Sequence, residues 1–242
     1  EVVRLGEGVD QNKTFKLEAI DRTLTSLQTF SREITRRGVE RIRFCATSAT
    51  RDATNRDLFI KGVEEILGIT PEVIPGTEEA SLSFRGATKE LAMAEGPFLV
   101  VDIGGGSTEF VYGTENVISA RSVNVGCVRM AERHQLTSPL SESSRIAAIA
   151  DIDAAIAEAA SEVPITKARS VIAVAGTATT VAAAALGLET YDRYAIHLAR
   201  ISAEKTHEIA QSFAAMTRSE IAALGYMHPG RVDVITAGSL VL

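Results

Sequence analysis

Apolar positions along the chain follow two periodicities, one typical of helices and one typical of strands. Residues 14–37 repeat apolar side chains at helical spacing and are followed by Gly38, which predicts a helix with a glycine C-cap. Further helices are predicted at residues 55–67, 80–93, 141–161, 181–186, 201–216 and 231–242. Short β-prone runs predict strands at residues 1–5, 41–46, 71–74, 98–103, 108–112, 116–124 and 170–175. Alternating helices and strands predict an α/β protein.

The stretch 98–112 is the centre of this pattern, because it joins two apolar runs through three glycines. Strand, glycine turn and strand form a hairpin, and consecutive Gly N–H groups can cradle an anion, with the Ser107 and Thr108 hydroxyls as further donors. Asp102 and Glu109 bracket the turn, and carboxylates beside a phosphate imply a divalent cation, Mg²⁺ above all. A tight hairpin without ligand is the alternative. No lysine follows the glycines and no helix opens there, which excludes a P-loop and a dinucleotide fingerprint.

Three other polar segments are candidates for chemistry. Residues 46–53 follow a predicted strand and contain Arg51, although their Thr and Ser residues are also good helix caps. Glu78 and Glu79 open a predicted helix, where the helix dipole alone favours acidic side chains. Residues 176–180 lead from a buried strand into a helix, which suits a phosphate but also a plain turn with a threonine cap.

Composition narrows the class of protein. The 242 residues are 45% hydrophobic and carry a net charge of −6, which argues against a nucleic-acid surface. Basic side chains outnumber acidic ones at residues 32–61, and a locally basic face on an acidic protein suits a small or linear anion. No apolar run reaches a membrane span, and Cys45 and Cys127 have no disulfide or metal spacing, so we expect a cytoplasmic protein.

Five segments in order resemble the exopolyphosphatase / guanosine pentaphosphate phosphohydrolase family of the actin/Hsp70/sugar-kinase superfamily. They are Ala-Thr-Ser-Ala-Thr-Arg, Gly-Thr-Glu-Glu-Ala, Asp-Ile-Gly-Gly-Gly-Ser-Thr-Glu, Gly-Thr-Ala-Thr-Thr and the terminal Val-Asp-Val-Ile-Thr-Ala-Gly. The resemblance covers nearly the whole chain. It implies an α/β fold with two ribonuclease-H-like (actin-like ATPase) domains flanking a cleft, at residues 1–96 and 97–242, with the terminal helix at their junction.

The resemblance also implies roles for individual residues. Glu79 matches the general base, with Glu78 one position away, and Arg51 matches an arginine that grips the substrate phosphate. Asp102 and Glu109 match the carboxylates that bind Mg²⁺ or Mn²⁺. The expected phosphate-binding residues are Gly104, Gly105, Gly106, Ser107, Thr108, Gly176, Thr177 and Thr179.

The implied reaction is metal-assisted hydrolysis of the terminal phosphoanhydride of inorganic polyphosphate. Guanosine pentaphosphate is the alternative substrate; a sugar or acetate kinase and a non-catalytic alarmone sensor are further alternatives. A homodimer is possible, and neither nucleic acid nor membrane is an expected partner. The family's first strand carries an Asp-x-Gly-x-Asn-Ser/Thr loop that nothing here matches, so we expect the first domain to lack its N-terminal strands and the sequence to be short at both ends.

Overall fold

The computed structural model describes all residues, 1–242, and the chain divides into two compact units, Glu1–Gly76 and Thr77–Leu242. Each unit has its own hydrophobic core. No helix is long and apolar enough to cross a membrane.

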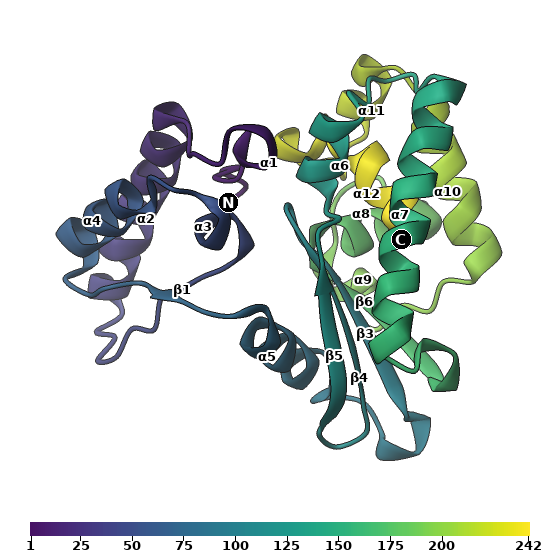
Figure 1. Ribbon diagram of the computed structural model, residues 1–242, viewed down its shortest axis with the longest axis horizontal. Coiled ribbons are helices and arrows are strands. Elements are labelled where there is room, and N and C mark those ends of the chain that lie inside the picture. The colour runs from purple at the N-terminus through teal and green to yellow at the C-terminus, as the bar shows by residue number, and fades with distance from the viewer. The chain divides into compact units, whose positions relative to one another are not determined.

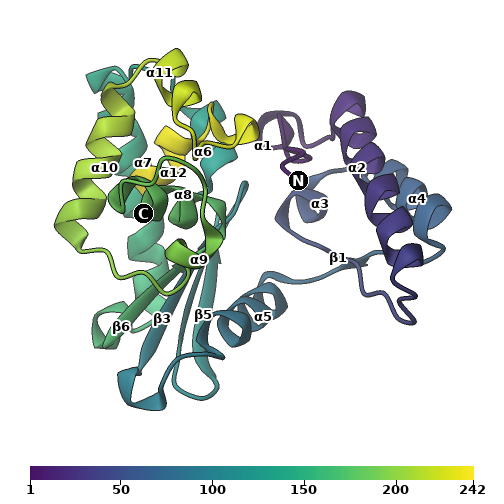
Figure 2. The same ribbon diagram turned by 180° about the vertical axis from the view of Figure 1, so that it is seen from behind.

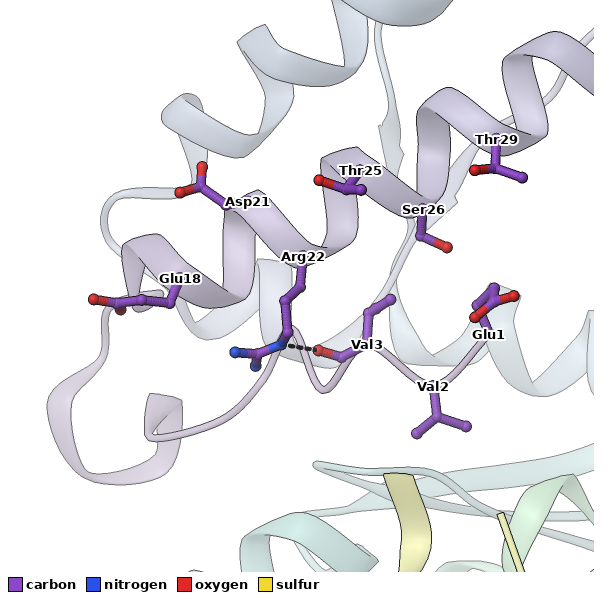
Figure 3. A pocket seen from close by; sticks show the side chains of 9 residues that line it. All are labelled: Glu1, Val2, Val3, Glu18, Asp21, Arg22, Thr25, Ser26 and Thr29. Carbon is purple, nitrogen blue, oxygen red and sulfur yellow. Dashed lines mark hydrogen bonds between the residues drawn. The ribbon is translucent and has the colours of Figure 1, made fainter. Parts of the chain in front are cut away.

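The first unit is helical with a small parallel sheet. Its core joins Phe15, Leu27, Phe59 and Val63, which bring α2 and α4 together. Its elements are α1 (Val9–Asn12), α2 (Leu17–Arg36), β1 (Cys45–Ala46), α3 (Ser48–Asp52), α4 (Arg56–Leu67) and β2 (Glu72–Val73). The residues before α1 run along α2, where Arg22 Nε donates to Val3 O at 3.3 Å beside a pocket (Figure 3).

The second unit is a four-stranded mixed sheet with helices on both faces. Its strand order is β5-β4-β3-β6, with β3–β4 and β4–β5 antiparallel and β3–β6 parallel. The strands are β3 (Phe98–Ile103), β4 (Thr108–Gly113), β5 (Val117–Val123) and β6 (Ser170–Val174). The helices are α5 (Gly76–Thr88), η1 (Met93–Glu95), α6 (Cys127–Arg133), α7 (Glu142–Glu162), η2 (Ile165–Lys167), α8 (Ala175–Ala185), α9 (Arg193–Ile196), α10 (Ala203–Ala215), α11 (Arg218–Ala223), η3 (Pro229–Arg231) and α12 (Ile235–Val241).

Alternate residues of β3 face different helices, as the pleat requires. Leu99 and Val101 pack with α7 and α12, whereas Phe98 and Val100 pack with Ala80 and Phe84 of α5. Figures 1 and 2 accordingly show α5 and α7 on opposite sides of the sheet. Asp102 has the same parity as Val100, so the α5 face is the one on which the candidate chemistry lies.

Several predicted elements are confirmed and others need correction. The hairpin and the helices at 14–37, 55–67, 141–161 and 201–216 appear within a few residues of their predicted bounds. Residues 1–5 form no strand, because Arg4 has φ 50°, outside the extended region. The strand predicted at 41–46 shortens to β1, because its partner β2 pairs with only two of its residues.

The end of the chain differs from expectation. The helix predicted at 231–242 is a 3-10 turn, η3, followed by α12. α12 contacts α6, α7, α8 and α10 of the second unit. Residues 77–96 belong to the second compact unit, in which α5 packs on the sheet, and the predicted domain boundary after residue 96 stays a prediction.

Candidate active site

The centre of the site is a pair of carboxylates on neighbouring strands. Asp102 of β3 and Glu109 of β4 are direct partners in the antiparallel ladder, so their side chains lie on the same face of the sheet. Neither carboxylate forms an ion pair in the structure. Two like charges held side by side without a counter-charge are unfavourable, and this is the arrangement that a cation relieves.

Helix α5 brings a third acidic side chain to this face. Ser83 Oγ donates a short hydrogen bond to Asp102 Oδ2. Glu79 lies one helical turn before Ser83, in the first turn of α5, so both side chains occupy one face of the helix. The charge of Glu79 contributes to the environment of Glu109, which shows that the predicted base and the predicted metal carboxylates lie near one another.

Glu109 is a buried acid with an altered titration. Its side chain is 1% exposed, and its Oε1 accepts hydrogen bonds from Ser107 Oγ (2.8 Å) and Ser122 Oγ (2.7 Å). Burial, and then the charges of Glu79 and Asp102, raise the pKa of Glu109 to about 7, although the two serine hydroxyls oppose this shift. The site therefore concentrates negative charge that water cannot screen.

The glycine turn is held from behind by the start of α6. The N–H groups of Cys127, Val128 and Arg129 donate to the Gly104 and Gly105 carbonyls at 2.9–3.0 Å, and Arg129 Nε donates to Gly106 O at 2.5 Å. The carbonyls of the turn are thus occupied, whereas the N–H groups of Gly105 and Gly106 have no acceptor in the structure. Such unpaired donors can bind an anion.

The hydroxyls of the turn have internal partners. Ser107 Oγ donates to Glu109, and Thr108 Oγ1 donates to Val125 O at 2.7 Å. Both residues are buried. The turn can therefore offer a phosphate its backbone N–H groups, while Ser107 and Thr108 hold the turn and the carboxylate in place.

The second predicted loop lies at the same edge of the sheet. Asp102 and Val174 are Cα partners in the parallel β3–β6 pair, and α8 begins directly afterwards at Ala175. The sequence predicted that Gly176, Thr177 and Thr179 lie in a loop before a helix. In the structure they lie at the start of the helix itself. The N-terminal N–H groups of α8 lie next to the glycine turn, where two strands end together.

The threonines of this segment also have internal roles. Thr179 Oγ1 donates to Gly176 O at 3.2 Å, and Thr177 is 4% exposed and packs against Gly238 of α12. The group closest to a Cβ built at Gly238 is the Thr177 side chain. Anion binding at α8 would therefore use main-chain donors.

Arg51 belongs to the first unit. It lies in α3, and its Nη1 donates to Ile74 O at 2.7 Å. Glu79, Asp102, Glu109 and the glycine turn all belong to the second unit, and the role of Arg51 stays a prediction.

Ser83, Ser122 and Arg129 were not predicted from the sequence. Ser83 could have been found, because it lies one turn after Glu79 on the predicted helix. Ser122 is the cross-strand partner of Glu109, which requires the register of β4 and β5. Arg129 lies in α6, and its contact with Gly106 depends on how α6 packs.

The donor set fits a hard divalent cation. Mg²⁺ takes oxygen ligands and uses one or two protein carboxylates, keeping water or substrate oxygens for its other positions. Asp102 and Glu109 supply two such carboxylates, side by side on one face of the sheet. No constellation of three or more His, Cys, Asp or Glu side chains offers an all-protein metal site.

Comparison with known proteins identifies the family. Residues 1–242 match the Ppx/GppA phosphatase family. Exopolyphosphatase 2 of Mycobacterium tuberculosis is 44% identical over 246 residues, which cover 100% of this chain and 77% of that protein. A guanosine-5'-triphosphate,3'-diphosphate pyrophosphatase of Pseudoalteromonas atlantica is 38% identical over 148 residues, covering 61% of this chain and 29% of that protein.

A crystal structure of an exopolyphosphatase-like protein superposes with a TM-score of 0.97 at 44% identity, covering 100% of this chain and 78% of that one. The site and the comparisons together define a phosphatase. The chain belongs to the Ppx/GppA phosphatase family, which confirms the resemblance drawn from its five segments.

Proposed function

We propose that this protein is an exopolyphosphatase that hydrolyses the terminal phosphoanhydride of inorganic polyphosphate and releases orthophosphate. The observation that carries the proposal is the Asp102–Glu109 pair beside a glycine turn with free N–H donors, with Glu79 at the same face. Full-length similarity to an exopolyphosphatase supports the choice of substrate.

Each residue has a physical role in this reaction. Glu79 accepts the proton of the attacking water, because hydrolysis needs a positioned base. The N–H groups of Gly105, Gly106 and the first turn of α8 bind phosphate oxygens, and the family resemblance assigns Arg51 to a substrate phosphate. Asp102 and Glu109 would hold Mg²⁺ or Mn²⁺, which when bound neutralises phosphate charge.

The two units are proposed to be ribonuclease-H-like domains of the actin-like type. The four-stranded sheet, with helices on each face and two phosphate-binding segments at one edge, supports this for the second unit. Division at 96–97 and a junction role for α12 stay predictions.

Guanosine pentaphosphate is the second candidate substrate, because a relative that covers 61% of this chain is named for that activity. The chemistry at the phosphoryl group would be the same. Phosphate release from polyphosphate and from guanosine pentaphosphate at equal concentration separates the two, and we expect the larger kcat/KM for polyphosphate. A larger value for the nucleotide would reverse the assignment.

Glu79→Gln tests the mechanism. Removing a general base loses about 10²–10⁴-fold in rate, and we expect that loss in kcat for phosphate release with little change in substrate affinity. Glu78→Gln is the matched control, since it makes the same change at the adjacent position of the same helical turn. If Glu78→Gln is the damaging variant, the base is misassigned; if neither variant is impaired, the protein is a sensor or uses another mechanism.

A further inference from the structure

The serine hydroxyls around the carboxylate pair occupy one oxygen of each acid. Ser83 donates to Asp102 Oδ2, and Ser107 and Ser122 donate to Glu109 Oε1. Asp102 Oδ1 and Glu109 Oε2 accept no hydrogen bond in the structure. Each carboxylate is thus left with one uncommitted oxygen, and the hydroxyls determine which one.

Ser83 differs from the other two serines in its origin. Ser107 and Ser122 come from the β3–β4 turn and from β5, so they belong to the same sheet as the acid they contact. Ser83 comes from α5, whose Ala80 and Phe84 are 1% and 0% exposed against the sheet. Its hydrogen bond is therefore a polar link between the helix that carries Glu79 and the strand that carries Asp102.

We propose that Ser83 is a positioning residue that fixes the Asp102 carboxylate so that Oδ1 alone is presented to the divalent cation. The inference rests on the proposed function, because it takes Asp102 as a metal carboxylate. No substrate contact is assigned to Ser83.

The physical basis is the freedom of an aspartate side chain. The terminal torsion of Asp is broad and nearly two-fold, so an unrestrained carboxylate exchanges its two oxygens and can turn both towards a cation. A hydroxyl bonded to one oxygen removes this freedom before the cation binds. Hydrogen-bond partners of metal ligands act in this way, and their loss typically costs about 10–100-fold in metal affinity or activity.

The link also constrains Glu79. Because Ser83 and Glu79 lie one turn apart on α5, a bond that holds Ser83 to Asp102 also limits rotation of the helix about its axis. The hydroxyl thus adds a polar constraint on the base and the cation site to the apolar packing of α5. This predicts that removal of the hydroxyl affects cation binding more strongly than it affects folding.

The test measures Mn²⁺ binding to the protein without substrate, by electron paramagnetic resonance, together with phosphate release. Ser83→Ala should weaken Mn²⁺ affinity by about 10–100-fold, and a saturating concentration of Mn²⁺ should recover much of kcat. Ser81→Ala is the matched control on the same helix, and it should leave both quantities unchanged. Ser83→Thr keeps the hydroxyl and should bind Mn²⁺ like the unaltered protein. Ser83→Val has nearly the same shape as Ser83→Thr but lacks the hydroxyl, so it should bind Mn²⁺ more weakly.

The Thr/Val pair keeps the test decisive if Ser83→Ala does not fold. Equal Mn²⁺ affinity in Ser83→Thr and Ser83→Val would overturn the proposal, because only the hydroxyl distinguishes them. Asp102→Asn separates the assignment of Asp102 as a metal carboxylate from the positioning role of Ser83. If Asp102→Asn loses Mn²⁺ while Ser83→Ala and Ser83→Val do not, the metal assignment stands and the positioning role fails; if Asp102→Asn binds Mn²⁺ normally, the metal assignment itself fails.

Discussion

Glu109 is an unfavourably placed carboxylate, because its side chain is buried near two other acids, Glu79 and Asp102. Burial and the neighbouring Glu79 raise its pKa from the usual 4.5 to about 7. Below about pH 4.5 the acid is protonated in folded and unfolded chains alike. Between that pH and about 7 only the folded chain holds the proton, so this group lowers stability progressively as the pH rises through that window.

Glu109→Gln, which removes the charge and keeps the shape, should therefore stabilise the metal-free protein at about pH 8. A shift from 4.5 to about 7 corresponds to at most about 3.5 kcal/mol, at about 1.4 kcal/mol per pKa unit. The measurement is urea unfolding of both proteins with a chelator, at about pH 4.5 and about pH 8. The difference should be small at the lower pH; an equal difference at both values would refute the assigned titration.

At the level of single residues, the sequence predicted the two site carboxylates better than it predicted the hydroxyl groups that donate hydrogen bonds to them. Asp102 and Glu109 could be found because they flank a glycine turn, and hairpin pairing then places them opposite each other. Ser122 lies opposite Glu109 only through the β4–β5 register, which is interrupted at Tyr112/Gly113 and cannot be counted from the sequence. The side chains of Ser107 and Thr108 were expected to face phosphate, but the structure gives their hydrogen bonds to Glu109 and Val125.

At the level of elements, the close contact between the glycine turn and α6 depends on Gly126. A Cβ at Gly126 would lie 2.6 Å from Gly105 O and 2.8 Å from Gly104 O, and both atoms are backbone that cannot turn aside. Gly126 has φ −160°, so the obstacle is steric and not conformational. The residue lets α6 donate its N–H groups to the carbonyls of the turn, which leaves the N–H groups of Gly105 and Gly106 without an acceptor.

Gly126→Ala should consequently displace the turn. We expect a loss of about 1–3 kcal/mol in the free energy of unfolding, and a loss of phosphate release larger than partial unfolding alone would produce. Gly86→Ala on α5 is the control, because no atom lies within 4 Å of its added Cβ and alanine favours a helix. Normal activity in Gly126→Ala would show that the turn does not need this position to bind phosphate.

Elements with strong local signals were predicted well, and those that depend on distant partners were not. The helix predicted at 141–161 is α7, and Ser141 caps it by accepting from Ser144 N at 3.2 Å. Residues 176–180 read as a loop because of their Gly and Thr content, yet α8 already includes them, with the sharp change of direction made by Ala175 at φ 67°. A non-glycine residue in that conformation is uncommon and has no sequence signature.

At the level of the whole molecule, the chain was expected to form two domains, and it forms two compact units. The start of the second compact unit could not be found from composition. The structure groups α5 with the sheet, because Ala80 and Phe84 are buried on it. Burial of a helix face against one particular sheet is a tertiary property, and the helical periodicity of α5 shows only that some face is buried.

The separate cores of the two units make a prediction about cooperativity. Phe59 is 2% exposed in the core of the first unit and Phe213 is 1% exposed in a core of the second, and the chain passes between the units at Gly76–Thr77. Phe59→Ala should lose about 3–5 kcal/mol, as buried Phe→Ala changes do, and that loss should fall on one unit. Scanning calorimetry should then resolve two transitions, of which Phe59→Ala lowers one and Phe213→Ala the other. If both variants instead lower one shared transition by the same amount, the units unfold together, and the interactions between them rival those within each core.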